Sequence, residues 1–377
     1  MKIVAAIDSF KGSLSSVQAG NAVKEAALKV NSSAQVFVCP IADGGEGTVE
    51  ALAAIADAEI IKVTVRDPLE LPVNAKYCIL KNSKTAVIEV AAAAGLTLVP
   101  NEKRNPLYTT TYGVGELIKD AIERGCRRFI IGIGGSATND GGAGMLSALG
   151  FELTDKNGKP ICSGTKGLEN LNSVSANNVI PELSECTFRI ACDVTNPLCG
   201  KNGCSAVFAP QKGADAEIIP IMDKWLWKYA NIAKALSDKA DPDLAGAGAA
   251  GGLGFAFAAF TNASLEPGIQ IILEETHLEK YIKNADLVIT GEGRLDAQTA
   301  MGKAPAGVAQ LAKKHGKRVI AFAGCVTDDA TVCNEYGIDA FFPILRNIIT
   351  LREAMNTETA YKNLVDTACQ VFRLIKI

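Results

Sequence analysis

The chain has 377 residues, with 38 lysine and arginine side chains against 41 aspartate and glutamate side chains, and its formal net charge is −3 at pH 7. This length predicts two domains, each with its own hydrophobic core. The charge balance excludes the basic surface that nucleic-acid-binding proteins need, so a small anionic ligand is favoured over a polymer. Eleven cysteines and no CxxC pair predict buried thiols in a reducing compartment rather than a disulfide framework.

The apolar run before Asp8 is too short for the hydrophobic region of a signal peptide, and we predict that it forms the first strand. The longest Ala/Gly-rich stretch, at residues 244–260, is short for a membrane-spanning helix. We therefore expect a cytoplasmic protein with no membrane partner and no nucleic-acid partner. The sequence leaves the oligomeric state open.

Strand and helix alternate in the first 60 residues. The strands are predicted at residues 2–8 and 34–41, and the helices at 17–30 and 48–57. Two such units in succession predict a parallel sheet with helical crossovers. From residue 60 to residue 91 the apolar residues alternate and two turn signals interrupt them, which favours antiparallel strands.

The middle of the chain is predicted to hold a helix at 113–124, strands at 127–134, 187–194 and 205–210, and a long helix that ends near 236. In the last hundred residues, the apolar strand that begins at 285 gives way to a charged loop that carries Glu292 and Arg294. A helix at 304–315, a strand at 317–324, another helix, a strand at 340–345 and a final helix to residue 376 follow. These last strands are apolar throughout, as in a sheet that is covered on both faces.

Because the two ends of the chain share one pattern and the middle another, we predict an α/β fold with two α/β domains. The first is Rossmann-like, with a parallel sheet made from both chain ends, at residues 1–60 plus 283–377. The second is an inserted mixed α/β domain at 61–282. The active site is predicted in the cleft between them.

Acidic side chains follow several of the predicted strands, each beside small or glycine neighbours. In parallel α/β sheets, ligands bind outside the carboxyl ends of the strands, so these acids should meet in one crevice. Carboxylate oxygens suit Mg²⁺, which usually binds together with phosphates. Any one of these acids could instead be the N-cap of the next helix. The residues concerned are Asp8, Asp43, Glu46, Asp140, Asp193, Glu292 and Asp296.

Cationic side chains lie in the same acidic loops. Lys11 follows the first strand and precedes Ser13 and a helix, where it could hold a phosphoryl group or a carboxylate. Arg294 offers a rigid fork for either group, and Lys303 offers a point charge. The alternatives are a solvated surface lysine in the first case and a salt-bridged loop in the second.

The stretch IGIGGSATNDGGAGM, at residues 131–145, predicts a phosphate cradle, because its glycines let backbone N–H groups crowd around an anion. The chain has no Walker A motif and no protein-kinase catalytic loop. A GxGxxG pattern at residues 246–251 lacks the preceding strand of a dinucleotide-binding fingerprint. The two histidines lie in polar, helix-like surroundings, which excludes a histidine triad and a zinc set. The remaining residue types suit phosphoryl transfer, which needs positioning and charge neutralisation.

Six long motifs follow one another along the chain: KIVAAIDSFKGSLSS, PIADGGEGTVEAL, IGIGGSATNDGGAGML, ACDVTNPLCG, GAGAAGGLG and GEGRLDAQTAMGKAP. In this order and from end to end, they resemble the bacterial type-1 glycerate kinase family. The resemblance implies ATP-dependent phosphorylation of D-glycerate, in this family typically at the 2-hydroxyl to give 2-phosphoglycerate. It also implies two α/β domains, one of them Rossmann-like, unrelated to the P-loop kinases. The expected substrates are glycerate and ATP, with Mg²⁺ as the cofactor.

The individual roles are hypotheses from chemistry. Lys11 and Arg294 are the candidates for holding the glycerate carboxylate or the moving phosphoryl group. Asp193 is the leading candidate for the general base, and Glu292 is the second. Asp43 and Asp140 are predicted to bind Mg²⁺, directly or through water. The predicted substrate- or phosphate-binding residues are Asp8, Ser9, Ser13, Gly134, Gly135, Ser136, Thr138, Asn139, Asn196, Asp296 and Lys303.

Three alternatives share parts of this pattern. A Mg²⁺-dependent kinase of another small hydroxy acid would use the same residue types. An NAD-linked hydroxy-acid oxidoreductase would explain the Rossmann-like ends, but the fingerprint and a histidine base are missing. A sensor of carbohydrate acids that regulates transcription would need a basic DNA-binding segment, and the sequence has none.

Overall fold

The computed structural model describes residues 1–375, and these form two compact units. Unit 1 comprises Met1–Asp43, Glu50–Ala56 and Pro267–Ile377, and unit 2 comprises Gly44–Val49 and Asp57–Glu266. The predicted domain limits at residues 60 and 283 and the predicted cleft stay predictions, because the units are defined by their compactness alone. Among the described helices, none is both long enough and apolar enough to cross a membrane.

Unit 1 contains a five-stranded sheet in the order β13-β12-β11-β1-β2, and all neighbouring strands are parallel. This confirms the predicted parallel sheet made from both ends of the chain. The chain leaves β1 through α1 toward one edge of the sheet and leaves β11 through α13 toward the other. The strands are β1 (Lys2–Ala5), β2 (Gln35–Val38), β11 (Leu287–Leu295), β12 (Arg318–Val326) and β13 (Ala340–Pro343).

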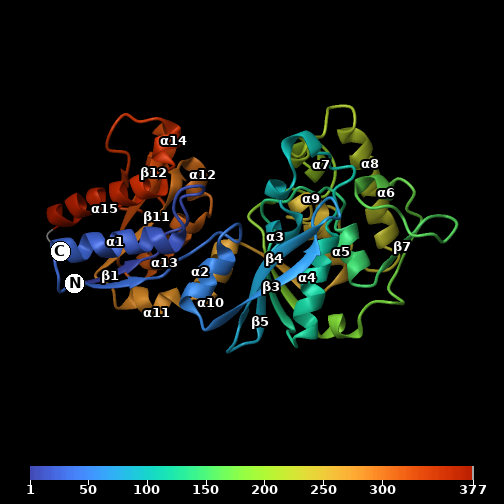
Figure 1. The fold of residues 1–377 in the computed structure, drawn as a ribbon, viewed down its shortest axis with the longest axis horizontal. Coiled ribbons are helices and arrows are strands. Elements are labelled where there is room, and N and C mark those ends of the chain that lie inside the picture. Colours follow the sequence, from blue (N-terminus) through green and yellow to red (C-terminus); the bar gives the residue numbers. More distant parts are fainter. Residues whose placement is uncertain (376–377) are drawn as a thin grey trace. The chain divides into compact units, whose positions relative to one another are not determined.

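Helices α1 and α15 lie side by side against one face of this sheet (Figure 1). Helix α1 begins after the N-cap Ser15, which forms a capping box with Gln18. Small buried residues such as Ala19 and Ala26 let α1 pack closely against α15 and the sheet. The helices of unit 1 are α1 (Ser16–Val30), α2 (Thr48–Ile55, which starts in unit 2), α10 (Gly268–Glu275), α11 (Leu278–Lys283), α12 (Ala297–Ala300), α13 (Ala304–Lys314), η5 (Asp328–Asn334), α14 (Leu351–Ala354) and α15 (Thr357–Leu374).

Unit 2 contains a six-stranded mixed sheet in the order β10-β9-β6-β5-β4-β3. Strands β3, β4 and β5 are antiparallel neighbours, as the alternation after residue 60 predicts, and the other pairs are parallel. The strands are β3 (Ala58–Arg66), β4 (Pro72–Leu80), β5 (Thr85–Glu89), β6 (Arg128–Gly132), β9 (Thr187–Ala191) and β10 (Ala263–Glu266), with the separate antiparallel pair β7 (Glu152–Thr154) and β8 (Ser173–Ser175).

The helices of unit 2 enclose a single large core cluster together with this sheet. Helix α4 packs against β3, β5 and α5 (Figure 1). The helices are α3 (Ala91–Ala94), η1 (Leu96–Leu98), η2 (Asn101–Lys103), α4 (Tyr112–Glu123), α5 (Ala143–Ala148), α6 (Thr165–Leu168), η3 (Pro181–Glu185), α7 (Cys204–Phe208), η4 (Pro210–Lys212), α8 (Ile219–Ala233) and α9 (Ala249–Phe260).

Three local predictions differ from the structure. The predicted strand at 205–210 is wrong, because these residues begin in helix α7; a short apolar run does not distinguish a strand from a buried helix. The predicted loop at Glu292 and Arg294 is also wrong, because both residues pair with β12 as part of β11. The predicted helix between β12 and β13 is the 3-10 helix η5. The final helix ends at Leu374, and its predicted end at residue 376 lies outside the described residues.

Two glycine-rich segments of unit 2 pack against each other. Gly251 has a φ of +69°, and its carbonyl oxygen accepts a hydrogen bond from the N–H of Gly141 at 2.9 Å. A Cβ atom on Gly251 would lie 2.1 Å from the carbonyl oxygen of Thr138. Glycine is therefore required here both by the left-handed backbone and by the close approach of the two segments.

We predict that Gly251→Ala lowers the free energy of unfolding much more than Gly158→Ala does. Gly158 has a similar φ of +74° but no atom within 4 Å of its Cβ position, so it is a matched control in the same unit. The left-handed backbone alone should cost about 1 kcal/mol, and the overlap should raise the loss to about 3 kcal/mol or more. Urea unfolding midpoints measure both losses, and equal losses would contradict the packing argument.

Candidate active site

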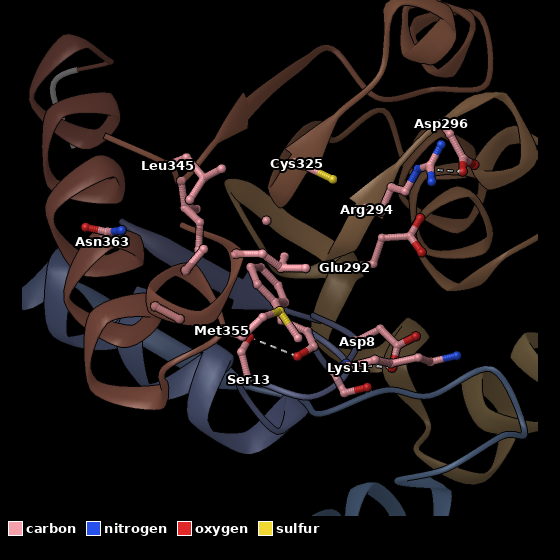
Figure 2. Close-up of a pocket in the computed structure, with 18 of the residues that line it drawn as sticks. Asp8, Lys11, Ser13, Glu292, Arg294, Asp296, Cys325, Leu345, Met355 and Asn363 are labelled. Atoms are coloured by element: carbon pink, nitrogen blue, oxygen red, sulfur yellow. Dashed lines mark hydrogen bonds and ion pairs between the residues drawn. The ribbon is translucent and has the colours of Figure 1, made fainter. Parts of the chain in front are cut away.

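A pocket of about 370 Å³ lies at the carboxyl end of the unit 1 sheet. Its lining comes from the segments that follow β1, β2 and β13, from the last residues of β11 and β12, and from α14 and α15. Figure 2 shows Asp8, Lys11, Glu292 and Arg294 toward one side of this pocket, with Leu345 toward the other. The pocket is thus at the switch point between β1 and β11, where open α/β sheets bind their ligands.

Backbone pairing continues past the end of β1 and fixes the first acidic residues. The N–H of Asp8 donates to the carbonyl oxygen of Gly291 at 2.9 Å, which sets Asp8 opposite the residue before Glu292. On the other side, Ile41 N–H donates to Ile7 O at 3.4 Å and carries the segment after β2 toward Asp43. The parallel register therefore brings Asp8, Asp43 and Glu292 to one edge of the sheet, and these three belong to the larger set of acids predicted to meet in one crevice.

Asp8 is the most strongly perturbed of these acids. It is 4% exposed, and its Oδ1 accepts a hydrogen bond from Ser9 N–H at 2.6 Å. Burial raises the pKa of Asp8 to about 7, with a further contribution from the negative charge of Asp43 and a smaller one from Glu292. Lys11 and the Ser9 hydrogen bond oppose this shift without cancelling it. Like charges have thus been gathered where burial makes their repulsion strong.

Lys11 is the cation of this acidic end. Its Nζ lies 3.3 Å from Oδ2 of Asp43, and its side chain is 62% exposed. Burial opposes its charge, but Asp43 and Asp8 prevail and raise the pKa of Lys11 above its usual value. The ammonium group therefore stays charged and accessible to a ligand. Ser13 lies nearby in the pocket lining and donates its hydroxyl hydrogen to Phe10 O at 3.0 Å.

Strand β11 and helix α12 hold the second group of charges. Burial raises the pKa of Glu292, whose Oε1 accepts a hydrogen bond from Thr299 Oγ1 at 2.5 Å. Asp296 caps α12 by accepting from Thr299 N–H, as the N-cap alternative predicts, and its carboxylate also faces Arg294 at 3.4 Å and Lys303 at 3.5 Å. The capping role of Asp296 and the predicted salt bridges thus both occur beside the pocket, although Arg294 lies in strand β11 rather than in a loop.

The other side of the pocket is apolar. It is formed by residues after β13 and by α14 and its C-cap: Ile344, Leu345, Leu351, Ala354 and Met355. We refer to these residues as the apolar wall. An apolar wall facing a charged end suits a ligand with one aromatic or aliphatic part and one anionic part.

The predicted site residues of the glycine-rich loop, and those that follow β9, belong to unit 2. Gly134 and Gly135 are exposed, whereas Ser136, Thr138 and Asn139 are buried. Asn139 Nδ2 donates to Ser205 Oγ at 2.9 Å. Farther along the chain, Asp193 is exposed and follows β9, and Asn196 donates to Asn202 O at 2.8 Å and accepts from Gly248 N–H at 2.9 Å. These residues are not part of the unit 1 pocket.

Asp140 is fully buried in unit 2, and its carboxylate already has several hydrogen-bond donors. Oδ2 accepts from both N–H and Oγ1 of Thr111 at 2.9 Å and from Gly144 N–H at 3.2 Å, while Oδ1 accepts from Gly142 N–H at 3.1 Å. Burial raises the pKa of Asp140, and these hydrogen bonds oppose the shift. The predicted metal-ligand role of Asp140 stays a prediction, and these contacts favour a role in holding the glycine-rich loop.

Sequence reasoning missed several residues that the structure places in these surroundings. Thr299, which orients Glu292, lies in the motif GEGRLDAQTAMGKAP, but a threonine near an acid carries no signal by itself. Lys212 is buried beneath the glycine-rich loop, 76 positions from its partner Ser136. The apolar wall follows the last strand, and its residues could have been assigned to the core. The burial of Lys212 and the place of the apolar wall in the pocket depend on contacts between distant parts of the chain, whereas Thr299 is only seven positions from Glu292.

The oxygen donors at the acidic end of the pocket can be compared with those that a Mg²⁺ ion needs. Across residues 1–375, no group of three or more His, Cys, Asp or Glu side chains is arranged to hold a metal ion by itself. Mg²⁺ usually keeps several waters and binds through one or two carboxylates plus phosphate oxygens. Asp43, intermediate in exposure and lining the pocket, can supply such a carboxylate. The residues present therefore fit a Mg²⁺ ion that arrives with a phosphate-bearing ligand.

Comparison with known proteins gives one consistent result. Residues 3–376 match the model of the glycerate kinase family. The chain is 47% identical to a Haemophilus influenzae protein named glycerate kinase, over 100% of this chain and 99% of that protein. It is 48% identical to an Escherichia coli protein named glycerate 2-kinase, over 100% and 97%. A crystal structure from Salmonella typhimurium LT2 superposes with a TM-score of 0.89 at 46% identity, over 100% of this chain and 98% of that one.

We predict that Asp8→Asn stabilises the metal-free protein more at pH 8 than at pH 5. The carboxyl ionises near pH 4 in the unfolded chain and near pH 7 in the fold, so wild-type stability falls as pH rises between these values. The side-chain amide of the Asp8→Asn variant does not ionise, so the variant does not lose this stability as the pH rises. Thermal unfolding of both proteins at the two pH values measures this effect. The difference in unfolding free energy between Asp8→Asn and wild type should be about 2 to 3 kcal/mol larger at pH 8 than at pH 5. An equal difference at both pH values would contradict the burial argument.

Proposed function

The chain belongs to the glycerate kinase family, and from that premise we propose that it transfers the γ-phosphoryl group of ATP to the 2-hydroxyl of D-glycerate. Its activity is that of a glycerate kinase, a phosphotransferase with an alcohol group as acceptor. The products are 2-phosphoglycerate and ADP. The name of the Escherichia coli relative supports the choice of the 2-hydroxyl.

The observation that carries the proposal is the two-sided pocket of unit 1. ATP has one aromatic, weakly polar end and one strongly anionic end, and the pocket offers an apolar wall and a charged end. Glycerate is too small and too polar to need the apolar wall. We therefore assign the wall to the base of ATP and the charged end to its phosphates, in agreement with the position of ligands at the switch points of parallel sheets.

The charged end supplies the electrostatic part of phosphoryl transfer. In the reaction the oxygen of the 2-hydroxyl forms a bond to the γ-phosphorus, the bond from that phosphorus to the bridging oxygen of ADP breaks, and the hydroxyl proton leaves to a base. Lys11 and Arg294 line this pocket, and we assign to them the neutralisation of phosphate charge, which is the main demand of this reaction. Asp43 would hold Mg²⁺, which when bound neutralises the phosphates further.

Two carboxylates remain candidates for the general base. Glu292 lies in the pocket, and its hydrogen bond with Thr299 holds it in place. Asp193 belongs to unit 2 and is exposed. The pocket lining favours Glu292, although the sequence favours Asp193. The base contributes orientation and late proton removal, on the order of 10²-fold or more, while charge neutralisation contributes the larger part.

We predict that the wild-type protein releases ADP from ATP and D-glycerate, that this requires Mg²⁺, and that the product is 2-phosphoglycerate. A coupled ADP-release assay over a panel of small hydroxy acids, followed by identification of the product by phosphorus NMR, checks all three statements. Activity with another acid only would replace glycerate in the proposal. Formation of 3-phosphoglycerate would correct the position, and NADH production without ADP would contradict kinase activity.

We predict that Lys11→Ala and Leu351→Asp impair different kinetic constants. Lys11→Ala should lower kcat by about 10²-fold or more, because it removes a charge that acts on the transferring group. Leu351→Asp should raise the KM for ATP and leave the KM for glycerate unchanged. The matched controls are Lys81→Ala, which removes a similarly exposed lysine paired with an aspartate, and Leu374→Asp, which is 75% exposed against 78% for Leu351. Wild-type constants for Lys11→Ala or Leu351→Asp would contradict the assignment of the pocket.

A further inference from the structure

Lys212 is buried in unit 2 without a carboxylate partner. It ends the 3-10 helix η4, is 2% exposed, and donates from Nζ to Thr138 O at 2.6 Å and to Ser136 Oγ at 2.9 Å. No acidic side chain in the described part of the chain lies at ion-pair distance from Nζ. Burial lowers the pKa of Lys212 to about 8, and Asp140 acts on it only at longer range. The side chain thus remains largely charged at neutral pH.

Burying a charge without a counter-ion costs free energy of folding, so the presence of a lysine at position 212 needs a reason. A neutral side chain could tie η4 to the glycine-rich loop without that cost. An ammonium group also carries three hydrogens, and the described residues provide only two acceptors. Lys212 therefore has both an uncompensated charge and an unused donor.

The hydroxyl of Ser136 links Lys212 to the glycine-rich loop. Because Ser136 Oγ accepts a hydrogen bond from Lys212, its own hydrogen must point toward a different acceptor. Within the described residues Ser136 Oγ donates to none. The hydroxyl is consequently a polarised donor beside the exposed glycines of the loop.

Backbone donors next to Ser136 are also without acceptors. The N–H groups of Gly134, Gly135 and Ser136 make no hydrogen bond to any residue that the structure describes. Gly135 has a φ of +73°, which turns the backbone here. Successive N–H groups in such a turn form an anion-binding concavity. Deeper in the same loop, Thr138 Oγ1 and Asn139 Oδ1 are buried without a hydrogen-bond partner.

We propose that Lys212, acting through Ser136, supplies the counter-charge of an anion-binding site at residues 134–136, and that its ligand is a carboxylate or phosphoryl group of a substrate of the kinase reaction. Lys212 is a positioning residue, because Ser136 and the backbone N–H groups contact the anion. The proposal rests on the proposed function for the identity of the ligand, but the existence of the site can be tested without turnover.

Steady-state kinetics of Lys212→Met and Ser136→Ala test the site. Either variant should raise the KM of one substrate by about 10-fold or more, the effect of one charge-assisted hydrogen bond. A rise for glycerate alone identifies the ligand as the carboxylate, and a rise for ATP alone identifies it as a phosphoryl group. The double variant should be no worse than the poorer single variant, because Lys212 acts through Ser136. Lys228→Met, an exposed lysine of unit 2 that also donates to a backbone carbonyl, is the control and should keep both wild-type values.

Thermal unfolding separates this role from a merely structural one. Glycerate alone or inorganic phosphate alone should raise the Tm of the wild-type protein, and Ser136→Ala should lose that shift while keeping the ligand-free Tm. These Tm measurements need no turnover, so they test the site even if the wild-type protein fails to phosphorylate glycerate. They use only wild type and Ser136→Ala, so they also test it if Lys212→Met does not fold. If both single variants keep wild-type KM values, or if Ser136→Ala keeps the full ligand-induced shift, the proposal is overturned.

Discussion

The chain leaves the centre of the unit 1 sheet by crossovers in opposite directions, and the position of the pocket depends on this arrangement. Helix α1 takes the chain from β1 to β2, whereas α13 takes it from β11 to β12 on the other side. No crossover then covers the carboxyl ends of β1 and β11, so side chains at the ends of these strands line a pocket there. Asp8 and Glu292 stand there because backbone pairing between the two strands continues beyond β1.

This geometry has an electrostatic cost that a purely structural site would not carry. Burial, reinforced by the charges of Asp43 and Glu292, holds the pKa of Asp8 near neutrality, and the charge of Lys11, which is accessible, opposes part of this shift. Such perturbed groups gather where a protein binds or transforms a charged ligand. A triphosphate with its divalent cation would bring both further negative charge and the positive charge that balances it. The gathering of acids and cations at this pocket is therefore better explained by a bound ligand than by the stability of the protein alone.

Unit 2 manages charge in the opposite way. Its glycine-rich segments approach so closely that side chains are excluded at Gly251, and Asp140, which belongs to one of these segments, accepts hydrogen bonds from donors of its own unit. Lys212 is buried against the same loop with neutral partners. Unit 1 thus places the exposed cations Lys11 and Arg294 beside buried acids around its pocket, whereas unit 2 buries both Asp140 and Lys212 at its glycine-rich loop. Charges at an open pocket can be solvated by water or by a ligand. A buried charge instead costs free energy whenever it lacks a hydrogen-bond or ion-pair partner.

The sequence by itself determined the family, the α/β class, the parallel sheet built from both chain ends and the antiparallel start of the inserted part, because periodicity, turns and long motifs are local signals. It also predicted the acids and cations of the pocket, since strand ends can be read from the sequence. Only the tertiary structure decided that Asp140 is enclosed by donors, that residues 205–210 begin in a helix, that Leu351 and Met355 line a pocket, and that Lys212 lies beneath Ser136. These features depend on which distant segments contact each other. Burial and hydrogen bonding between such segments produce no periodic pattern in the sequence from which they could be predicted.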